Sequence, residues 1–381
     1  MTMLQPDPAA LMAAARARTG LHDFGTADFE SALAVLVRAM RDEANLTEAG
    51  MAWQLEEHVE ALAVRLRMQE WIERSPEILD QPVDRPVIIV GLQRSGTSKL
   101  FRNIASDPRW NVLKTWQALQ PVPLAMEHDG PDPRIAMAEQ WCAERNWMQH
   151  VHHFDAQAPE MEALLLKQSF MINHPGRLVP SHRAWCETAD FGPVYRHLRR
   201  QLQFLQWQNG WAPGRRWILK TPAHLLSLPA LVETFPDATL VMTHRHPGSS
   251  VGSMLGLVAL SQEKSACSVD RARVREEWMR ILSLSIERFL AFCATQGANR
   301  FVHVRFSDVA RRPLAAVEQI YAAAGEEVDG PTRDAILSWH EDHPQHQHGR
   351  HRYDIADFGL DRADIDRAFK PYLDRYGGLL D

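Results

Sequence analysis

A glycine-rich loop follows a short apolar run at Val87–Val90. The loop, Gly91–Ser98, contains two glycines, one arginine and three hydroxyl side chains. Glycines let the backbone turn tightly, and a helix that starts after such a loop presents unpaired N–H groups to an anion. The sequence therefore predicts a phosphate- or sulfate-binding site that consists of Arg94, Ser95, Gly96, Thr97 and Ser98.

The loop lacks parts that ATP hydrolysis requires. A Walker A motif has a lysine where this chain has Thr97. No later strand ends in an obvious magnesium-binding aspartate, because the run Thr239–Arg245 ends in His-Arg. Arg94 instead supplies a forked cation inside the loop. These departures disfavour metal-dependent ATP hydrolysis, and they leave a small-molecule kinase with a degenerate phosphate loop as an alternative.

A second anion site is predicted at the end of the run Thr239–Arg245. Arg245 emerges there, Pro247 suits a first helical position, and Ser253 lies eight positions after the arginine. A helix N-terminus preceded by a basic residue attracts anions. Two such sites at the ends of two strands suggest one ligand with two separated phosphate-like groups.

Candidate general bases cluster in a short segment that is rich in histidine and glutamate. Glu160 and Glu162 follow Pro159 at a predicted helix start. Because they are two positions apart on a helix, only one of them should face a site. His152 and His153 are alternative bases, since an unperturbed histidine titrates near neutral pH.

Together these motifs resemble the sulfotransferase family that uses 3′-phosphoadenosine 5′-phosphosulfate. The family's 5′-phosphosulfate loop often reads as a glycine followed by R-S-G-T, which matches Gly91 and Arg94–Thr97. Its 3′-phosphate motif has an arginine at a strand end and a serine eight positions later, which matches Arg245 and Ser253. Three more segments look like the bacterial branch of that family: Leu219–Leu225, Val304–Pro313 and His348–Leu360.

The resemblance implies a sulfotransferase that moves a sulfuryl group from this donor to a hydroxyl or amine of a small-molecule acceptor without a metal ion. Arg94 would stabilise the leaving phosphate, and Lys220 at the end of an apolar run could reach the bridging oxygen. The resemblance also places an acidic base near Glu160 and Glu162, with His153 as a rival.

The chain departs from the family pattern at three places. The lysine that many members have in the loop is absent, and Arg94 stands in for it. Phe306 stands where a tyrosine is often found near the adenine. The glycine-rich tail motif is not recognisable, and Gly349, Arg350 and His351 are expected to reach the nucleotide in its place. A non-catalytic nucleotide-binding module is the other alternative that the sequence leaves open.

Composition excludes several other functions. The net charge of -6 argues against a nucleic-acid partner. Three features together predict a cytoplasmic protein without an integral membrane segment. The four cysteines are scattered, no basic segment precedes an apolar core at the N-terminus, and no apolar run is long enough to span a membrane. The histidines near His150 and His348 have no recognised metal-ligand spacing, so no metal site is expected. The acceptor and the oligomeric state stay open.

Alternating strands and helices must position these residues. Strands are expected at four apolar runs, namely Pro86–Gly91, Trp217–Lys220, Thr239–Arg245 and Phe301–Phe306. Helices are expected between them, from Thr97, over His224–Phe235 and over Arg271–Thr295. This alternation predicts an α/β fold with a P-loop-like, doubly wound, mainly parallel sheet flanked by helices.

Two further regions complete the predicted domain organisation. Residues 1–82 are expected to form a helical N-terminal extension, with Thr47 as a helix N-cap, and residues 83–381 the α/β domain. Within that domain, residues 107–214 are expected to supply the helices of an acceptor pocket and lid. Five aromatic residues could line this pocket or belong to the core: Trp110, Trp116, Trp141, Trp147 and Phe154.

Overall fold

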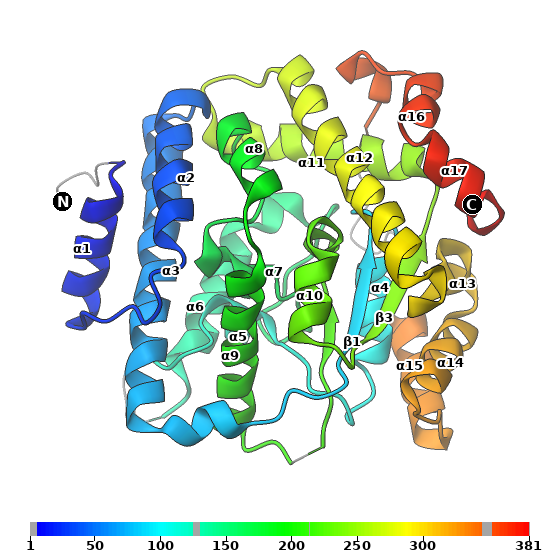
Figure 1. Ribbon diagram of the computed structural model, residues 1–381, viewed down its shortest axis with the longest axis horizontal. Coiled ribbons are helices and arrows are strands. Elements are labelled where there is room, and N and C mark those ends of the chain that lie inside the picture. Colours follow the sequence, from blue (N-terminus) through cyan, green and yellow to red (C-terminus); the bar gives the residue numbers. More distant parts are fainter. Residues whose placement is uncertain (1–5, 125–129, 213, 345–352, 381) are drawn as a thin grey trace.

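The structure is a computed structural model that describes residues 6–124, 130–212, 214–344 and 353–380. Within these residues a sheet of four parallel strands has the order β2-β1-β3-β4. The strands are β1 (Val87–Gly91), β2 (Ile218–Lys220), β3 (Thr239–His244) and β4 (Phe301–Arg305). They coincide with the four predicted apolar runs, so the prediction of a parallel α/β fold is confirmed (Figure 1).

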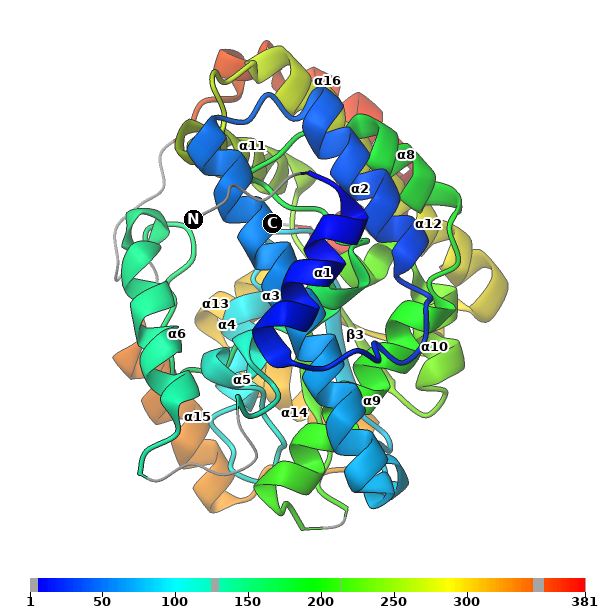
Figure 2. The ribbon, with the colours of Figure 1, turned by 90° about the vertical axis from the view of Figure 1, so that its left-hand side faces the viewer.

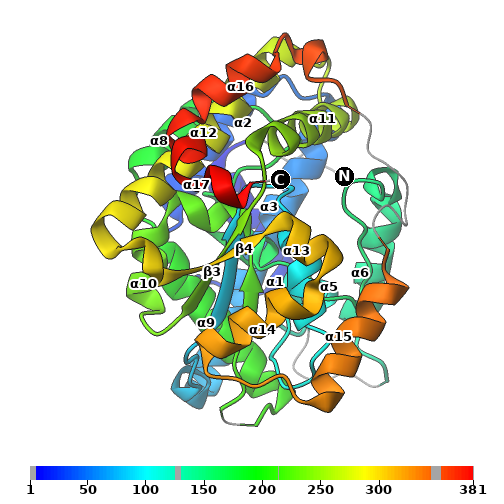
Figure 3. The same cartoon turned by 90° about the vertical axis from the view of Figure 1, so that its right-hand side faces the viewer.

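Helices cover both faces of the sheet (Figures 1 and 3). The side chains of β1 alternate between these two faces. Ile88 and Val90 belong to one hydrophobic cluster, and Val87 and Ile89 to another. The first cluster includes side chains from α9 (Gly192–Asn209), α10 (Leu228–Thr234) and α12 (Arg271–Gln296). The second includes side chains from α4 (Thr97–Ile104), α13 (Phe306–Arg311), α14 (Pro313–Ala324) and α15 (Gly330–Asp342).

The N-terminal residues form helices that share the first hydrophobic cluster. These are α1 (Pro8–Thr19), α2 (Glu30–Glu43) and α3 (Glu48–Arg74), with α1 lying across α3 in Figure 2. Thr47 caps α3 as predicted, because its Oγ1 accepts a hydrogen bond of 3.0 Å from the Gly50 amide. Leu55, Val59 and Leu62 of α3 are fully buried in the same cluster as the sheet. The described N-terminal helices therefore pack into the same hydrophobic core as the sheet.

The segment predicted to form the acceptor pocket contains mostly short helices. They are α5 (Thr115–Leu119), α6 (Pro133–Glu144), α7 (Ala163–Leu166) and α8 (Pro180–Thr188), while the longer α9 packs against the sheet. The remaining helices are α11 (Pro247–Ser265), α16 (Arg362–Ala368) and α17 (Lys370–Tyr376). No helix in the described ranges is both long and apolar enough to span a membrane.

The start of α3 contacts the end of α11 so closely that Gly50 has no room for a side chain. A Cβ atom on Gly50 would lie 2.1 Å from the carbonyl oxygen of Ser265, which also accepts a hydrogen bond of 2.9 Å from the Thr47 amide. We expect Gly50→Ala to lower the free energy of unfolding by about 2 kcal/mol, because two backbones must move apart. Urea denaturation measures this change.

Gly330→Ala is the matched control. Gly330 also lies in the first turn of a helix, but open space surrounds it. Alanine there should change stability by less than about 1 kcal/mol. Equal stabilities of the Gly50→Ala variant and the wild type would contradict the close contact.

Candidate active site

The parallel register brings the ends of three strands to one edge of the sheet. Ile89 of β1 pairs with Lys220 of β2, and Gly91 of β1 pairs with Thr243 of β3. Ligands of open α/β sheets bind at the carboxyl ends of the strands. The loop after β1, the end of β2 and the start of α11 therefore meet at this edge, although they are far apart in the sequence.

The loop after β1 is fixed by contacts on both sides. The hydroxyls of Ser95 and Thr243 lie 2.7 Å apart, so the loop is tied to β3. Gly96 has a φ of 90°, and a Cβ atom there would lie 2.7 Å from the ring of Phe306. Helix α4 begins directly after, at Thr97, and the first amides of a helix have no acceptor within it. The first amides of α4 therefore have no acceptor within the helix, and the binding of an anion to them stays a prediction.

Arg94 connects the two predicted anion sites. Its Nε donates a hydrogen bond of 3.1 Å to the Ser253 hydroxyl, and its Nη1 donates one of 2.7 Å to the Val151 carbonyl. Arg245 donates to the carbonyl of Arg94 (2.7 Å), and its guanidinium lies 4.0 Å from the centre of the Phe306 ring. The structure thus brings Arg94, Arg245 and Ser253 together. Burial and the charge of Arg245 lower the pKa of Arg94.

Lys220 reaches the start of α4 from the end of β2. Its Nζ donates a hydrogen bond of 3.1 Å to the Ser98 hydroxyl, and the side chain is buried. Burial lowers the pKa of Lys220, with Arg102 and Arg94 acting in the same direction and two glutamates opposing them. The lysine and the loop together form a buried cationic end of the site.

His152 and Glu160 form a buried pair beside this cationic end. His152 Nε2 lies 2.7 Å from the Glu160 carboxylate, and Arg102 of α4 lies 3.7 Å from the same oxygen. Burial lowers the pKa of His152, although Glu160 opposes this effect, so the imidazole is neutral at neutral pH. Burial alone would raise the pKa of Glu160, but His152, Lys220 and Arg102 lower it to about 2. The pair is therefore a neutral imidazole held by a carboxylate.

Glu162 has a different environment from Glu160. Its carboxylate accepts a hydrogen bond of 2.8 Å from the Lys220 amide and lies 2.6 Å from His224 Nε2. His224 Nδ1 lies 2.9 Å from the hydroxyl of Tyr195, and all three side chains are buried. Glu162 therefore holds the end of β2 within a closed network.

A cavity of about 290 Å³ lies between these groups. Its polar end is lined by residues that the sequence singled out, namely Arg94, Thr97, Ser98, His152 and Lys220. Its larger, mainly apolar part is lined by aromatic and aliphatic side chains, including Trp53, Trp141, Trp147, Phe154, Met254 and Leu257. Cationic groups and an apolar chamber thus share one space.

Several predicted site residues lie elsewhere. Glu160, Glu162 and His153 are not among the described side chains that line the cavity, and Arg102 donates to the His153 carbonyl instead. Trp110 donates to the hydroxyl of Tyr321 in the core, and Trp116 packs under the guanidinium of Arg134. The predicted nucleotide-binding tail residues, Gly349, Arg350 and His351, lie outside the described residues.

Two lining residues that the sequence analysis did not identify come from α3. Trp53 and Glu57 belong to the N-terminal helices, and no local motif marks them. In the part of the chain that the structure describes, no group of three His, Cys, Asp or Glu side chains is placed to hold a metal ion.

Comparisons with known proteins agree with this geometry. A family model described as "Sulfotransferase family" matches residues 86–330, so the chain belongs to the sulfotransferase family. Sulfotransferase STF1 from Mycobacterium tuberculosis H37Rv is similar over 97% of this chain and 99% of its own, with 29% identity and a TM-score of 0.83. Sulfotransferase STF9 from Mycobacterium avium is similar over 97% of both chains, with 26% identity and a TM-score of 0.86. No curated protein matches.

The predicted resemblance is thereby confirmed: the chain is a sulfotransferase. The two solved structures are similar over nearly the whole chain, whereas the family model begins at residue 86. The fold similarity therefore includes the N-terminal helices.

Glu162 offers a test of the buried network. We expect Glu162→Gln to lower the free energy of unfolding by about 1–3 kcal/mol, because the amide of glutamine cannot accept from both the Lys220 amide and His224. Chemical denaturation measures the loss, and Glu233→Gln on the exposed side of α10 is the control. A Glu162→Gln variant as stable as this control would show that the network does not hold β2.

Proposed function

We propose that the chain transfers a sulfuryl group from 3′-phosphoadenosine 5′-phosphosulfate to the hydroxyl of an acceptor with an apolar body, with His152 as the general base. The observation that carries this proposal is the position of a neutral imidazole, held by Glu160, in the same cavity as Arg94 and Lys220. Sulfuryl transfer to a hydroxyl requires a base and cationic groups. The apolar side chains of the cavity suit an acceptor with an apolar body.

The donor set suits a nucleotide with two anionic groups. The loop and Lys220 would hold the 5′-phosphosulfate, since hydroxyls, helix amides and two cations converge there. Arg245 and Ser253 would hold the 3′-phosphate, and both contact Arg94. We also propose that Gly349, Arg350 and His351 approach the nucleotide, as the family resemblance implies.

The side chains divide the reaction between them. His152 Nε2–H donates to Glu160, which leaves Nδ1, without a hydrogen bond among the described residues, to take the proton of the acceptor hydroxyl. The acceptor oxygen forms a bond to sulfur while the bond from sulfur to the bridging phosphate oxygen breaks. Arg94 and Lys220 stabilise the negative charge on the leaving phosphate. The products are the sulfate ester and 3′,5′-bisphosphoadenosine.

Glu160 is a positioning residue in this scheme, because it does not line the cavity and acts through His152. A carboxylate that accepts from one ring nitrogen fixes the tautomer and orientation of the imidazole. Arg102 holds this arrangement from α4, since it bonds the carbonyls of His153 and Pro159. The helix that begins in the phosphate loop therefore also sets the position of the base.

Donor binding tests the two anion sites. We expect 3′,5′-bisphosphoadenosine to raise the melting temperature without magnesium, because a ligand that binds only the native state stabilises it. Arg245→Ala should weaken its binding about ten- to a hundredfold, the effect of losing a charged hydrogen bond. Isothermal calorimetry measures the affinity, and Arg333→Ala is the control, since Arg333 pairs with Glu318 on the surface. Stabilisation by ATP with magnesium but not by the bisphosphate would refute the assigned donor.

The pH profile tests the base. Because the pKa of His152 lies below its usual value, kcat/KM should be constant at neutral pH and fall only below about pH 6.5. His152→Asn should lower kcat about a hundredfold or more and remove this acidic limb. Glu160→Gln should also lower kcat, and it should move the limb to lower pH because the carboxylate raises the pKa of His152.

His153→Asn distinguishes the two neighbouring histidines. If this variant, rather than His152→Asn, removes the acidic limb, the assignment of the base is wrong. A purely structural role of Glu160 would lower activity without moving the limb. A radiolabelled donor, offered with a panel of alcohols and phenols, measures transfer and separates an enzyme from a nucleotide-binding module.

A further inference from the structure

Helix α11 runs along the cavity that contains His152, from the phosphate loop to a second group of polar side chains. Near its start, Ser253 accepts the hydrogen bond from Arg94. Four residues of α11, spaced three or four apart and so on one face of the helix, line the cavity: Met254, Leu257, Ser261 and Lys264. The helix advances about 16 Å from Ser253 to Lys264, because it rises about 1.5 Å per residue. Lys264 therefore marks a part of the cavity far from the phosphate loop, which we call the remote end.

Two other segments meet Lys264 at the remote end. Gly176, which precedes α8, lies between His174 and the end of α11. A Cβ atom on Gly176 would lie 2.9 Å from the ring of His174 and 3.4 Å from the hydroxyl of Ser265. The ring centre of Trp53 on α3 lies 5.9 Å from that of His174. Trp53, His174 and Lys264 all line the cavity, so three segments that are distant in the sequence form the remote end.

His174 offers an unused hydrogen-bond donor at the remote end. Its Nδ1 accepts a hydrogen bond of 3.0 Å from the Gly176 amide. Burial, together with the charges of Arg177 and Lys167, holds the pKa of His174 well below its usual range. The ring is therefore neutral at neutral pH and has its proton on Nε2. This Nε2–H has no hydrogen-bond partner among the described residues, and it keeps accessible surface.

Lys264 adds a cation that forms no ion pair among the described residues. Its side chain is exposed, and its Nζ lies 5.8 Å from the centre of the Trp147 ring, which lines the same cavity. No neighbouring carboxylate in the described part of the chain therefore offsets its charge.

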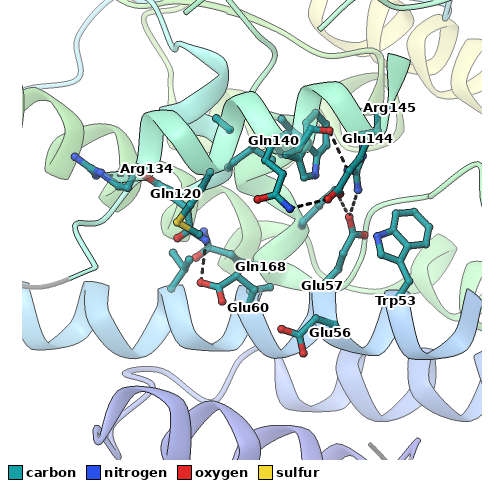
Figure 4. A pocket seen from close by; sticks show the side chains of 18 residues that line it. Trp53, Glu56, Glu57, Glu60, Gln120, Arg134, Gln140, Glu144, Arg145 and Gln168 are labelled. Atoms are coloured by element: carbon teal, nitrogen blue, oxygen red, sulfur yellow. Dashed lines mark hydrogen bonds and ion pairs between the residues drawn. The ribbon is translucent and has the colours of Figure 1, made fainter. Parts of the chain in front are cut away.

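The charges of the remaining wall do not compensate Lys264. Figure 4 shows the adjoining cavity between α3 and α6, where Arg145 and Glu57 point toward each other. Arg145 and Lys167 lie 3.1 and 3.6 Å from the same oxygen of Glu57. Glu144 also lies 3.8 Å from Arg145, but it does not line the cavity that contains His152. Among the described side chains that line this cavity, five are cationic and Glu57 alone is anionic. The excess of positive charge favours an anionic ligand.

We propose that the remote end binds an anionic group, such as a carboxylate, which the acceptor carries at the opposite end from the hydroxyl that is sulfated. The group accepts a hydrogen bond from His174 Nε2–H and pairs with Lys264, while the apolar side chains of α11 contact the body of the acceptor. This inference rests on the proposed function, because it places the reacting hydroxyl beside His152. The acceptor is then an elongated hydroxy acid whose two ends lie about 16 Å apart, the span of α11 along the cavity.

Two matched series of acceptors test this proposal. One consists of ω-hydroxy fatty acids of increasing chain length, and the other of the alkanediols of the same lengths, each below its critical micelle concentration. We expect the wild type to prefer the acids, most strongly where the extended distance from hydroxyl to carboxylate is about 16 Å. Lys264→Met should lower the ratio of kcat/KM for the acid to kcat/KM for the diol about tenfold, mainly through KM, because one charge-assisted hydrogen bond is lost.

Lys370→Met is the matched control and should leave this ratio unchanged, because Lys370 pairs with Asp374 on the surface and does not line the cavity. Lys264→Glu distinguishes an effect of charge from an effect of shape, since it should lower the ratio further than Lys264→Met does. Equal ratios in the wild type and in Lys264→Met would overturn the proposal.

A binding measurement separates this inference from the proposed function. We expect calorimetry with the enzyme bound to 3′,5′-bisphosphoadenosine to show that a fatty acid binds more tightly than the primary alcohol of the same length, and Lys264→Met to remove this difference. An alcohol that binds as tightly as the acid would contradict an anion site. If neither series is sulfated but the acid still binds through Lys264, the proposed function fails in its choice of acceptor and the assignment of the remote end holds.

Discussion

The active site depends on the register of β1 with its two neighbours in the sheet. Side chains alternate between the faces of a strand, so a shift by one residue would turn every side chain to the other face. Lys220 reaches Ser98 only because it pairs with Ile89 near the end of β1. Glu162 reinforces this register, since it accepts a hydrogen bond from the Lys220 amide where β2 ends. The position of the cationic end is therefore a property of the sheet.

Local patterns were sufficient to predict the strands and to locate the two segments that we propose bind anions. Buried parallel strands are continuous apolar runs, and the loop Gly91–Ser98 and the pair Arg245 and Ser253 lie directly after such runs. Each of these signals needs only a few consecutive residues. The parallel order of the strands follows from the intervening helices, so the meeting of the two segments at one edge could also be inferred.

Which of the two neighbouring histidines faces the cavity could not be predicted, because this depends on contacts between distant segments. His152 and His153 are adjacent in a segment without regular periodicity, and nothing local decides which of them faces the cavity. Arg102, about fifty residues earlier, decides it by bonding the His153 and Pro159 carbonyls. Glu160 and Glu162 are the same residue type two positions apart, so the sequence does not distinguish them. In the structure Glu160 holds His152, whereas Glu162 holds the end of β2.

The N-terminal helices illustrate the same limit. The spacing of Leu55, Val59 and Leu62 predicts a buried helix face but not its partner, because apolar contacts are not directional. In the structure this face packs into the core, while Trp53 and Glu57 of the same helix line the cavity. The wall of the cavity thus comes partly from residues that precede the family's motifs.

The charges of the site explain why it suits an anionic ligand before any ligand binds. Burial and the charge of Arg245 lower the pKa of Arg94. Burial also lowers the pKa of Lys220, and Arg102 and Arg94 act in the same direction, against Glu160 and Glu162. Hydrogen bonds to backbone carbonyls and hydroxyls hold Arg94, Arg245 and Lys220 in place, and Glu160 and Glu162 offset part of the charge of Lys220. A doubly anionic donor would relieve this repulsion on binding. In the function proposed here these cations lie where negative charge would develop on the leaving phosphate, so catalysis would need little rearrangement.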